Sequence, residues 1–282
     1  MKDISYEILD LMQEYGSDSA GLRRILESQT SPEILMALSP IRENLVEWMD
    51  IGKEERVLQL GSGYGALTGA LARKAGEVVV VDPRVENLEV NRIRHQDRKN
   101  IRYQEGEDAD LGGQSFDWVF LIGPETNEAV FGISRAKDNW DKQEEQRITM
   151  IEKIRRAAKL TAFGGHMVLA FPNTHSMRVW SGDKPDTEEL TVSLSELLAI
   201  VDSLKGEKRE LYYPLPDYKL PSMIYSDTYP PVKGEIPAMF AAYEKPRHRL
   251  FSEDAAYSAL CEAGGFAQFA NSFLLVWEKG RK

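Results

Sequence analysis

Residues 57–72 read VLQLGSGYGALTGALA, and this stretch decides the fold. A run of apolar residues ends at Leu60, glycines follow at alternate positions, and a helical apolar pattern comes directly after them. A strand that turns so tightly into a helix needs residues without Cβ, both for its backbone angles and for close approach of a ligand. The stretch therefore predicts a strand, a ligand-binding glycine loop (Gly61, Gly63 and Gly65) and a helix.

Short apolar runs alternate with helical patterns on both sides of this loop. Such alternation predicts βαβ units, a mainly parallel sheet and the α/β fold class. The apolar runs predict strands over 56–60, 77–82, 100–105, 116–123, 165–171, 208–215 and, last, within 269–280. The helical patterns cover 66–75, 85–94, about 145–160, 193–204 and 252–265, the last of which ends on Gly264.

Two segments stand outside this alternation. Residues 1–50 place apolar side chains three and four apart, which predicts a helical N-terminal cap with Ser31 and Pro32 at the start of one helix. Residues 214–247 are rich in proline and tyrosine, and proline excludes a regular helix or a central strand. We expect one domain over residues 51–282, with 214–247 as a lid-like insertion at the edge of the sheet.

Composition excludes several classes of partner. The 282 residues include 35 Lys and Arg against 45 Asp and Glu, a net charge of −10, so binding to nucleic-acid phosphates is not expected. The N-terminus lacks the features of a secretory signal, and no apolar run approaches the ~20 residues of a membrane span. Cys261 is the single cysteine, so neither a disulfide nor a cysteine-built metal site is expected. These features favour a cytoplasmic protein.

The glycine loop by itself fits two cofactors. Its G-x-G-x-G spacing suits S-adenosylmethionine (SAM), whereas Gly61, Gly63 and Ala66 also satisfy the G-x-G-x-x-A pattern of dinucleotide binders. The next buried strand ends at Asp82, where a carboxylate accepts hydrogen bonds from ribose hydroxyls. Asp82 therefore indicates an adenosine ligand without deciding between SAM and NAD.

The later elements decide between them. GEDAD at 106–110 follows the third strand, and FDWVFLIG and FGGHMVLAF supply the fourth and fifth strands. In order and spacing this series resembles class I SAM-dependent methyltransferases, from about residue 40 to the end. The resemblance implies a Rossmann-like sheet with an antiparallel last strand, SAM as cofactor and S-adenosylhomocysteine (SAH) as product. It implies no metal, and a cofactor site of Gln59, Gly61, Ser62, Gly63, Gly65, Asp82, Pro83, Glu107, Asp108, Ala109, Ile122 and Gly123. Arg42 is a further candidate, for the cofactor carboxylate.

Three segments narrow the resemblance to one subgroup of these enzymes. LSPIRENLVEWM (38–49), YYPLPDYKLPSMIYSDTYPP (212–231) and FANSFLLVWEKG (269–280) look like a bacterial subgroup often encoded with, or fused to, glycosyltransferases of surface-polysaccharide assembly. The implied reaction is methyl transfer to a hydroxyl or other polar atom of a carbohydrate or glycosylated small molecule. The implied partners are this substrate and a glycosyltransferase.

The chain also departs from the pattern of these enzymes. Gln59 stands where they commonly have an acid, Pro124–Thr126 replaces Val-Leu-Glu, and Phe171–Asn173 replaces Ile-Glu-Asn. The glycines and Asp82 are intact. We therefore expect the changes to affect the choice of acceptor and the activity more than cofactor binding. Two alternatives stay open: a methyltransferase of a natural-product or peptide metabolite, and a catalytically silent SAM-fold partner of a glycosyltransferase.

The catalytic candidates lie after predicted strands. Methyl transfer to a hydroxyl needs alignment and a general base, for which we consider His175, Asp217 and Asp227. The tyrosines around the insertion either stack on sugar rings or pack it against the sheet. We assign His95 and the basic series from Arg92 to Arg102 to a solvated helix face.

Overall fold

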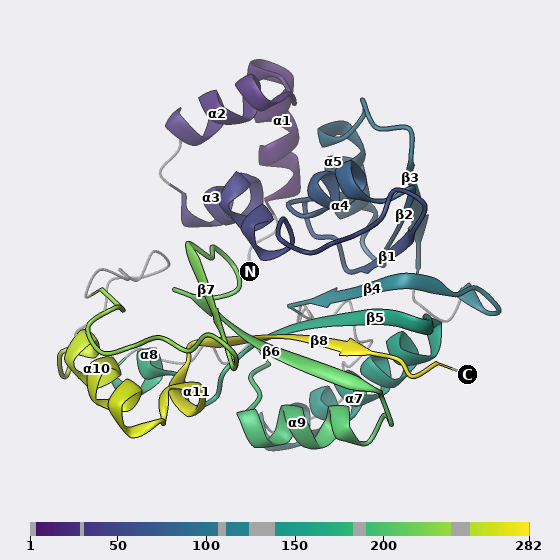
Figure 1. Ribbon diagram of the computed structural model, residues 1–282. Helices are drawn as coiled ribbons and strands as arrows, with labels where there is room; N and C mark the ends of the chain where they lie inside the picture. Colours follow the sequence, from purple (N-terminus) through teal and green to yellow (C-terminus); the bar gives the residue numbers. More distant parts are fainter. Residues whose placement is uncertain are drawn as a thin grey trace. The chain divides into compact units, whose positions relative to one another are not determined.

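The computed structural model describes residues 4–28, 31–106, 111–123, 139–182, 190–237 and 249–281, apart from the side chains of residues 139–144. The chain forms two compact units, whose elements are labelled in Figure 1. The first unit takes Met1–Leu121 and Lys153–Met167, and the second takes Ile122–Glu152 and Val168–Lys282. Each unit is therefore built from two separate segments of chain.

Eight strands are hydrogen-bonded in the order β3-β2-β1-β4-β5-β8-β6-β7. Their bounds are β1 Arg56–Leu60, β2 Glu77–Asp82, β3 Ile101–Glu105, β4 Phe116–Ile122, β5 Thr161–Pro172, β6 Lys208–Leu215, β7 Met223–Ser226 and β8 Ser272–Glu278. β1 pairs in parallel with β2 and β4, β2 pairs in parallel with β3, and β6 is antiparallel to both β8 and β7. The prediction of a mostly parallel α/β sheet with an antiparallel last strand is confirmed.

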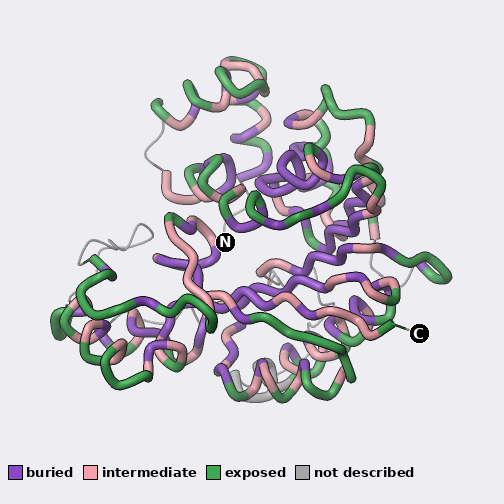
Figure 2. Tube along the Cα trace, viewed as in Figure 1, coloured by how far each residue is buried: buried purple, intermediate pink, exposed green. Residues whose placement is uncertain are grey.

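The central strands of the first unit are apolar because both of their faces are covered. β1 and β2 are buried from their second residue onward, as Figure 2 shows along the Cα trace, whereas β3 alternates between intermediate and exposed residues. The register Leu58↔Val79 and Leu58↔Val119 fixes the C-terminal ends of β1 and β2 beside each other. This register places the glycine loop next to Asp82.

The first unit also contains the predicted N-terminal helices. They are α1 Ser5–Tyr15, α2 Ser19–Ser28, α3 Pro32–Leu38 and the 3-10 helix η1 Pro40–Leu45, followed after β1 by α4 Thr68–Lys74 and α5 Val85–Arg94. Ser31 caps α3 by accepting a hydrogen bond from the Ile34 N–H, and Pro32 follows it in the first turn, as predicted. The apolar pattern continues past Leu38, but the α-helix ends there because Ser39 is extended before Pro40.

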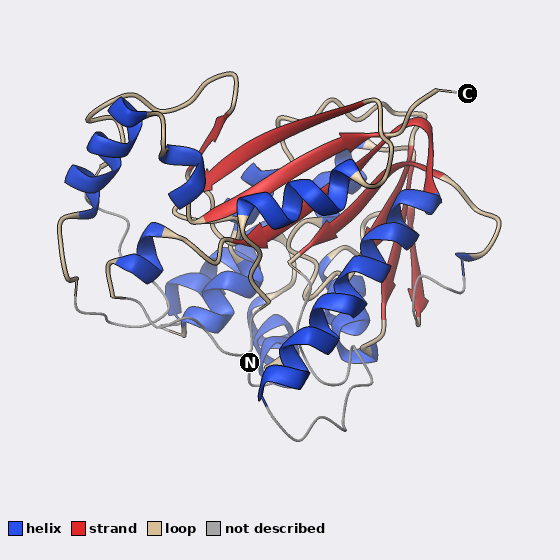
Figure 3. Cartoon of the chain, turned by 90° about the horizontal axis from the view of Figure 1, so that it is seen from below, coloured by secondary structure: helices blue, strands red, loops and turns tan. Residues whose placement is uncertain are grey.

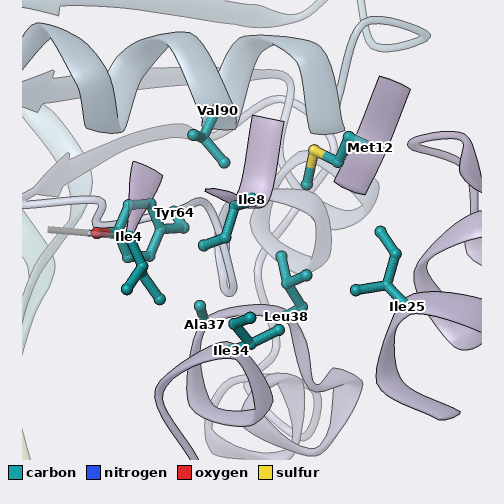
Figure 4. Close-up of a cluster of buried hydrophobic side chains, with 9 residues drawn as sticks. All are labelled: Ile4, Ile8, Met12, Ile25, Ile34, Ala37, Leu38, Tyr64 and Val90. Atoms are coloured by element: carbon teal, nitrogen blue, oxygen red, sulfur yellow. The ribbon is translucent and has the colours of Figure 1, made fainter. Parts of the chain in front are cut away.

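A cluster of buried apolar side chains holds α1, α2 and α3 together (Figure 4). α1 contacts both α2 and α5, so the cluster also reaches the strand-and-helix part of the unit. We call it the cap core: Ile4, Ile8, Met12, Ile25, Ile34, Ala37, Leu38, Tyr64 and Val90. Two of its members come from outside the N-terminal helices, Tyr64 from the glycine loop and Val90 from α5.

The helices of the second unit lie mainly around β6 and β8. They are α8 Met177–Trp180, α9 Leu194–Asp202, α10 Glu253–Ala263 and α11 Phe266–Phe269, while α7 Asn139–Leu160 contributes to both units and starts earlier than the predicted Glu145. Ser193 and Glu196 form a capping box at the start of α9. α9 lies alongside the β6 and β8 strands, as Figures 1 and 3 show from two directions, and it buries Leu194, Leu197 and Val201.

The described part of the proline-rich insertion, up to residue 237, contributes an edge strand. Pro214 lies inside β6, in agreement with the strand predicted over 208–215, and pairs with Ile224 of β7. Since β6 lies between β8 and β7, the exclusion of a central strand is wrong at this proline. Proline is tolerated there because the register of β6 with β8 covers Lys208–Tyr212 and ends before it. Residues 238–247 of the insertion lie outside the described residues.

The end of α10 gives a direct test of the fold. Gly264 caps this helix with a φ of 70°, and a Cβ at that position would meet nothing within 4 Å. We expect Gly264→Ala to lower the free energy of unfolding by about 1 kcal/mol through backbone strain alone, measured by urea denaturation followed by circular dichroism. Gly112→Ala, at a site that is equally open but has no left-handed φ, is the control and should stay close to wild type.

Candidate functional site

The three glycines of the loop all adopt left-handed backbone conformations. Their φ angles are 73° for Gly61, 48° for Gly63 and 77° for Gly65, a region that other residues rarely enter. A Cβ on Gly65 would lie 2.6 Å from Asn91 Oδ1, so this glycine also permits close packing on α5. Gly61 is exposed, and a Cβ there would meet nothing within 4 Å. The loop therefore presents bare backbone to open space at Gly61.

The Asp82 carboxylate holds the loop in place. Its Oδ2 accepts hydrogen bonds from the Ser62 N–H at 2.7 Å, the Gly63 N–H at 3.2 Å and the Ser62 hydroxyl at 3.2 Å. Its Oδ1 accepts from the Arg84 N–H and the Asn87 amide, both at 3.0 Å. Asp82 is only 2% exposed, so these five donors compensate the cost of burying its charge.

The loop is not arranged to cradle a phosphate. Phosphate-binding loops present their backbone N–H groups to the ligand. Here the Ser62 and Gly63 N–H groups donate to Asp82, the Gly61 N–H donates to the Val81 carbonyl, and the Gly65 N–H donates to the Ser62 carbonyl. A diphosphate at this loop would also lie close to the buried carboxylate and be repelled by it.

A chain of neutral hydrogen bonds lies behind the loop. The Thr68 hydroxyl donates to Gln59 Oε1 at 2.8 Å and accepts from the Asn91 amide at 2.9 Å, and the Tyr103 hydroxyl donates to the Asn91 carbonyl at 3.3 Å. Gln59 is 4% exposed and supplies a neutral acceptor to α4. Although Gln59 replaces the acid that is common at this position, the buried hydrogen bonds of this chain are still made.

Two arginines lie close to the loop. Arg94 is buried and donates to three backbone carbonyls, those of Ala37 at 2.8 Å, Leu38 at 3.1 Å and Tyr64 at 3.2 Å. Burial lowers the pKa of Arg94 to about 10, with Glu43 raising it and Arg42 lowering it. The assignment of this basic series to a solvated face is wrong for Arg94, because the carbonyls of α3 and of the loop replace water around its guanidinium.

Arg42 has an unsatisfied donor. Among the described residues, its Nε is buried and has no hydrogen-bond partner. Arg42 lies in η1 and is near enough to Arg94 for the two like charges to interact. A buried, unpaired guanidinium N–H beside a second cation is a favourable place for an anion.

His95 also contacts the glycine loop. It ends α5, and its Nε2 lies 2.8 Å from the Gly65 carbonyl oxygen. Burial lowers the pKa of His95 to about 4, so the imidazole is neutral at pH 7 and donates Nε2–H to that carbonyl. The expectation of a solvated His95 is wrong because the ring packs against α4 at Gly69, where a Cβ would lie 2.6 Å from Cε1.

The remaining predicted cofactor residues have different positions. Pro83 follows Asp82 and is half-buried, while Ile122 and Gly123 end β4 in the second unit. The Gly123 N–H donates to the Ala170 carbonyl at 3.0 Å. The predicted residues Glu107, Asp108 and Ala109, and the departure at Pro124–Thr126, lie outside the described residues.

The three base candidates lie in the second unit. His175 is exposed, and its backbone N–H donates to Asn173 Oδ1 at 2.9 Å. Asp217 is 4% exposed; its Oδ2 accepts from Arg178 Nη1 at 3.0 Å, and its Oδ1 from backbone N–H groups of the following turn. Asp227 accepts a hydrogen bond from the Tyr213 hydroxyl at 2.5 Å. His175 and Asp227 are both exposed, whereas Asp217 is buried.

Most tyrosines around the insertion pack inside the second unit. Tyr213, Tyr225 and Tyr257 surround Phe266, with ring centroids 5.4, 6.0 and 5.8 Å from it. Burial and the hydrogen bond to Asp227 raise the pKa of Tyr213, which keeps its hydroxyl protonated. Tyr229 is 78% exposed and is thus available to a ligand.

Two other features are absent from the described ranges. No group of His, Cys, Asp or Glu side chains among these residues has an arrangement that could hold a metal ion. No helix within them is both long and apolar enough to span a membrane.

Comparison with known families identifies the part of the chain that contains the loop. Residues 57–131 match the methyltransferase domain family. This part of the chain is therefore similar to that family, and the match includes β1, the glycine loop and Asp82. Among curated proteins, none matches the chain in sequence.

Solved structures share the fold of this chain. Phosphoethanolamine N-methyltransferase 1 from Haemonchus contortus, solved with phosphoethanolamine and SAH, is 13% identical with a TM-score of 0.53, over 98% of this chain and 49% of that chain. The [4+2]-cyclase SpnF is 12% identical with a TM-score of 0.50, over 86% and 80%. An rRNA methylase from Streptococcus thermophilus is 13% identical with a TM-score of 0.41, over 89% and 97%. The first two structures, with TM-scores of at least 0.50, establish a common fold, which by itself leaves the reaction open.

Sequence reasoning missed the buried polar face of α5. Asn87, Asn91 and Arg94 all point inward and contact, respectively, Asp82, Thr68 and the Tyr64 carbonyl. Their positions i, i+4 and i+7 lie on one helix face. That spacing was a usable signal, since polar residues recurring on the same face as Val90 indicate buried hydrogen bonds.

His95 predicts how the stability of the methyltransferase domain depends on pH. Its pKa is 6.5 in the unfolded state and about 4 in the folded state. Between these pH values only the unfolded state gains a proton, so the free energy of unfolding decreases as pH falls. We expect the stability difference between wild type and His95→Gln to shrink by about 2 kcal/mol from pH 7.5 to pH 5, measured by urea denaturation. Parallel pH profiles for the two proteins would contradict the burial of a neutral His95.

Proposed function

We propose that this protein is a class I SAM-dependent methyltransferase. The observation that carries the proposal is the glycine loop closed onto the buried Asp82 carboxylate, within the segment that matches the methyltransferase domain family. The bound cofactor supplies an electrophilic methyl group on a sulfonium. The protein binds and orients this donor.

The charge at the loop favours SAM over a dinucleotide. SAM carries no phosphate and has a positive sulfonium and ammonium, so a carboxylate beside the loop attracts it. NAD carries a diphosphate, which would need the N–H groups that Asp82 and the loop carbonyls already occupy. The cofactor that the loop alone left ambiguous is therefore SAM.

The residues around the loop fit the parts of SAM. The open space at Gly61 leaves room for a ligand against bare backbone. Asp82 accepts the ribose hydroxyls by exchanging its longest contacts, the 3.2 Å bonds from Ser62 Oγ and the Gly63 N–H. Arg42 gives its unpartnered Nε–H to the cofactor carboxylate.

The acceptor is a hydroxyl or other polar atom of a carbohydrate or glycosylated small molecule. This assignment is supported by the resemblance of residues 38–49, 212–231 and 269–280 to the glycosyltransferase-associated subgroup, which also supports a glycosyltransferase partner and a cytoplasmic location. Residues 1–50 are a helical cap on the domain of residues 51–282, and 214–247 act as its lid. In the lid Tyr229 stacks on the sugar.

Among the three base candidates, we assign the role of general base to His175 or Asp227. Asp217 is already engaged by Arg178 and by two backbone N–H groups, so it orients the turn at 217–220. The His175 side chain is exposed, and Asp227 has an oxygen besides the one bound to Tyr213. Either group is able to take the proton that an attacking hydroxyl loses.

Ligand binding tests the proposal directly. We expect isothermal titration of the purified chain to show binding of SAM and SAH and no heat with NADH, because only the former lack a diphosphate. Binding of NADH without SAM or SAH would overturn the proposal. Formation of SAH from SAM with glycan extracts then separates an active enzyme from a catalytically silent SAM-binding partner of a glycosyltransferase.

Arg42 is tested with a truncated ligand. We expect Arg42→Ala to weaken SAH binding by about 1–3 kcal/mol, the cost of removing a charged hydrogen bond to a carboxylate. 5′-Methylthioadenosine lacks that carboxylate, so its affinity should be the same for wild type and variant, measured by the same titration. Equal losses for both ligands would show that Arg42 acts on the loop and not on the carboxylate.

A further inference from the structure

The glycine loop and the N-terminal helices share one buried core. Tyr64, in the middle of the loop, is 8% exposed and belongs to the cap core with Ile4, Ala37 and Val90 (Figure 4). A side chain in this position cannot leave the cap core without moving the loop backbone between Gly63 and Gly65. The loop is therefore anchored on one side by the N-terminal helices.

Arg94 makes the same connection with hydrogen bonds. Its Nη1 donates both to the Tyr64 carbonyl and to the Ala37 carbonyl, and its Nη2 donates to the Leu38 carbonyl. Ala37 and Leu38 end α3, where helix carbonyls have no intrahelical partner. One buried cation thus satisfies the end of a cap helix and the centre of the glycine loop together.

A second, more distant contact joins the cap to α5. Just after α5, Gln96 Nε2 donates to Ser17 Oγ at 2.9 Å, between α1 and α2, and α1 also contacts α5. On α5, Asn87 donates a hydrogen bond to Asp82, and Arg94 donates one to the Tyr64 carbonyl. Both contacts help to hold the loop. The cap, α5 and the loop therefore form one continuous packed network.

We propose that the helices of residues 4–38 set the conformation of the SAM-binding loop, with Tyr64 and Arg94 as the positioning residues that couple them. The inference rests on the proposed function for the identity of the ligand. Coupling of this kind is reciprocal: a ligand that fixes the loop must stabilise the cap, and a weakened cap must bind the ligand less tightly. A cap that only covered the protein surface would do neither.

Hydrogen exchange of the wild-type chain tests the first direction. We expect saturating SAH to slow amide exchange in α1, α2 and α3 at least fivefold, although these helices lie outside the loop. Slowed exchange in residues 61–67 with unchanged exchange throughout α1, α2 and α3 would overturn the proposal.

Matched core variants test the second direction. Ile25→Ala removes three carbons from the cap core, and Leu197→Ala removes three from α9 in the second unit; both side chains are at most 1% exposed. We expect Ile25→Ala to weaken SAH binding at least threefold and Arg94→Met at least tenfold, with less than a twofold change for Leu197→Ala. Equal affinities for Ile25→Ala and Leu197→Ala would refute the coupling, since a purely structural role affects unfolding and not affinity.

A readout without ligand separates this proposal from the proposed function. If the wild-type chain binds no SAH, the proposed function fails, and exchange at residues 61–67 still decides the coupling. We expect these amides to exchange at least fivefold faster in Ile25→Ala than in Leu197→Ala. Indistinguishable exchange of the loop in the two variants would overturn the coupling whether or not SAH binds.

Discussion

A single buried carboxylate organises the first unit. Asp82 gathers donors from the glycine loop, from its own turn and from α5. Carboxylates are costly to bury, and this one is tolerated because five donors point at it. The left-handed glycines, the parallel register of β1 with β2 and the inward-facing Asn87 are all needed to bring those donors together.

The same carboxylate determines which ligand suits the loop. Glycine loops of this spacing serve both phosphate-containing and phosphate-free cofactors, and the difference lies in where their N–H groups point. When an acid of the protein already occupies these groups, the loop becomes a structural support for the ligand and no longer an anion receptor. Positive charge near the loop comes from two other residues, Arg42 and Arg94, which interact with each other electrostatically.

The sequence was sufficient to predict the elements whose pattern depends on local burial. β2, α5 and β6 begin and end at the predicted residues, because continuous apolar runs and helical spacing reflect covered faces. Arg94 was not predictable in this way, since its burial depends on carbonyls of α3 more than fifty positions earlier in the chain. The exclusion of a central strand for the proline-rich segment failed at Pro214, because its tolerance depends on where the pairing with β8 stops, which is a property of register and not of composition. Among the site residues, the positions of the loop and Asp82 followed from sequence, whereas the partners of Asp82 required the fold.

The division of the chain into two discontinuous units has a consequence for synthesis. The first unit includes Lys153–Met167, so the strands and helices of residues 1–121 lack part of their packing surface until the ribosome has passed Met167. The nascent chain must carry the cap, the glycine loop and all of α7 before that surface is complete. No single cut in the polypeptide yields the two units as whole pieces.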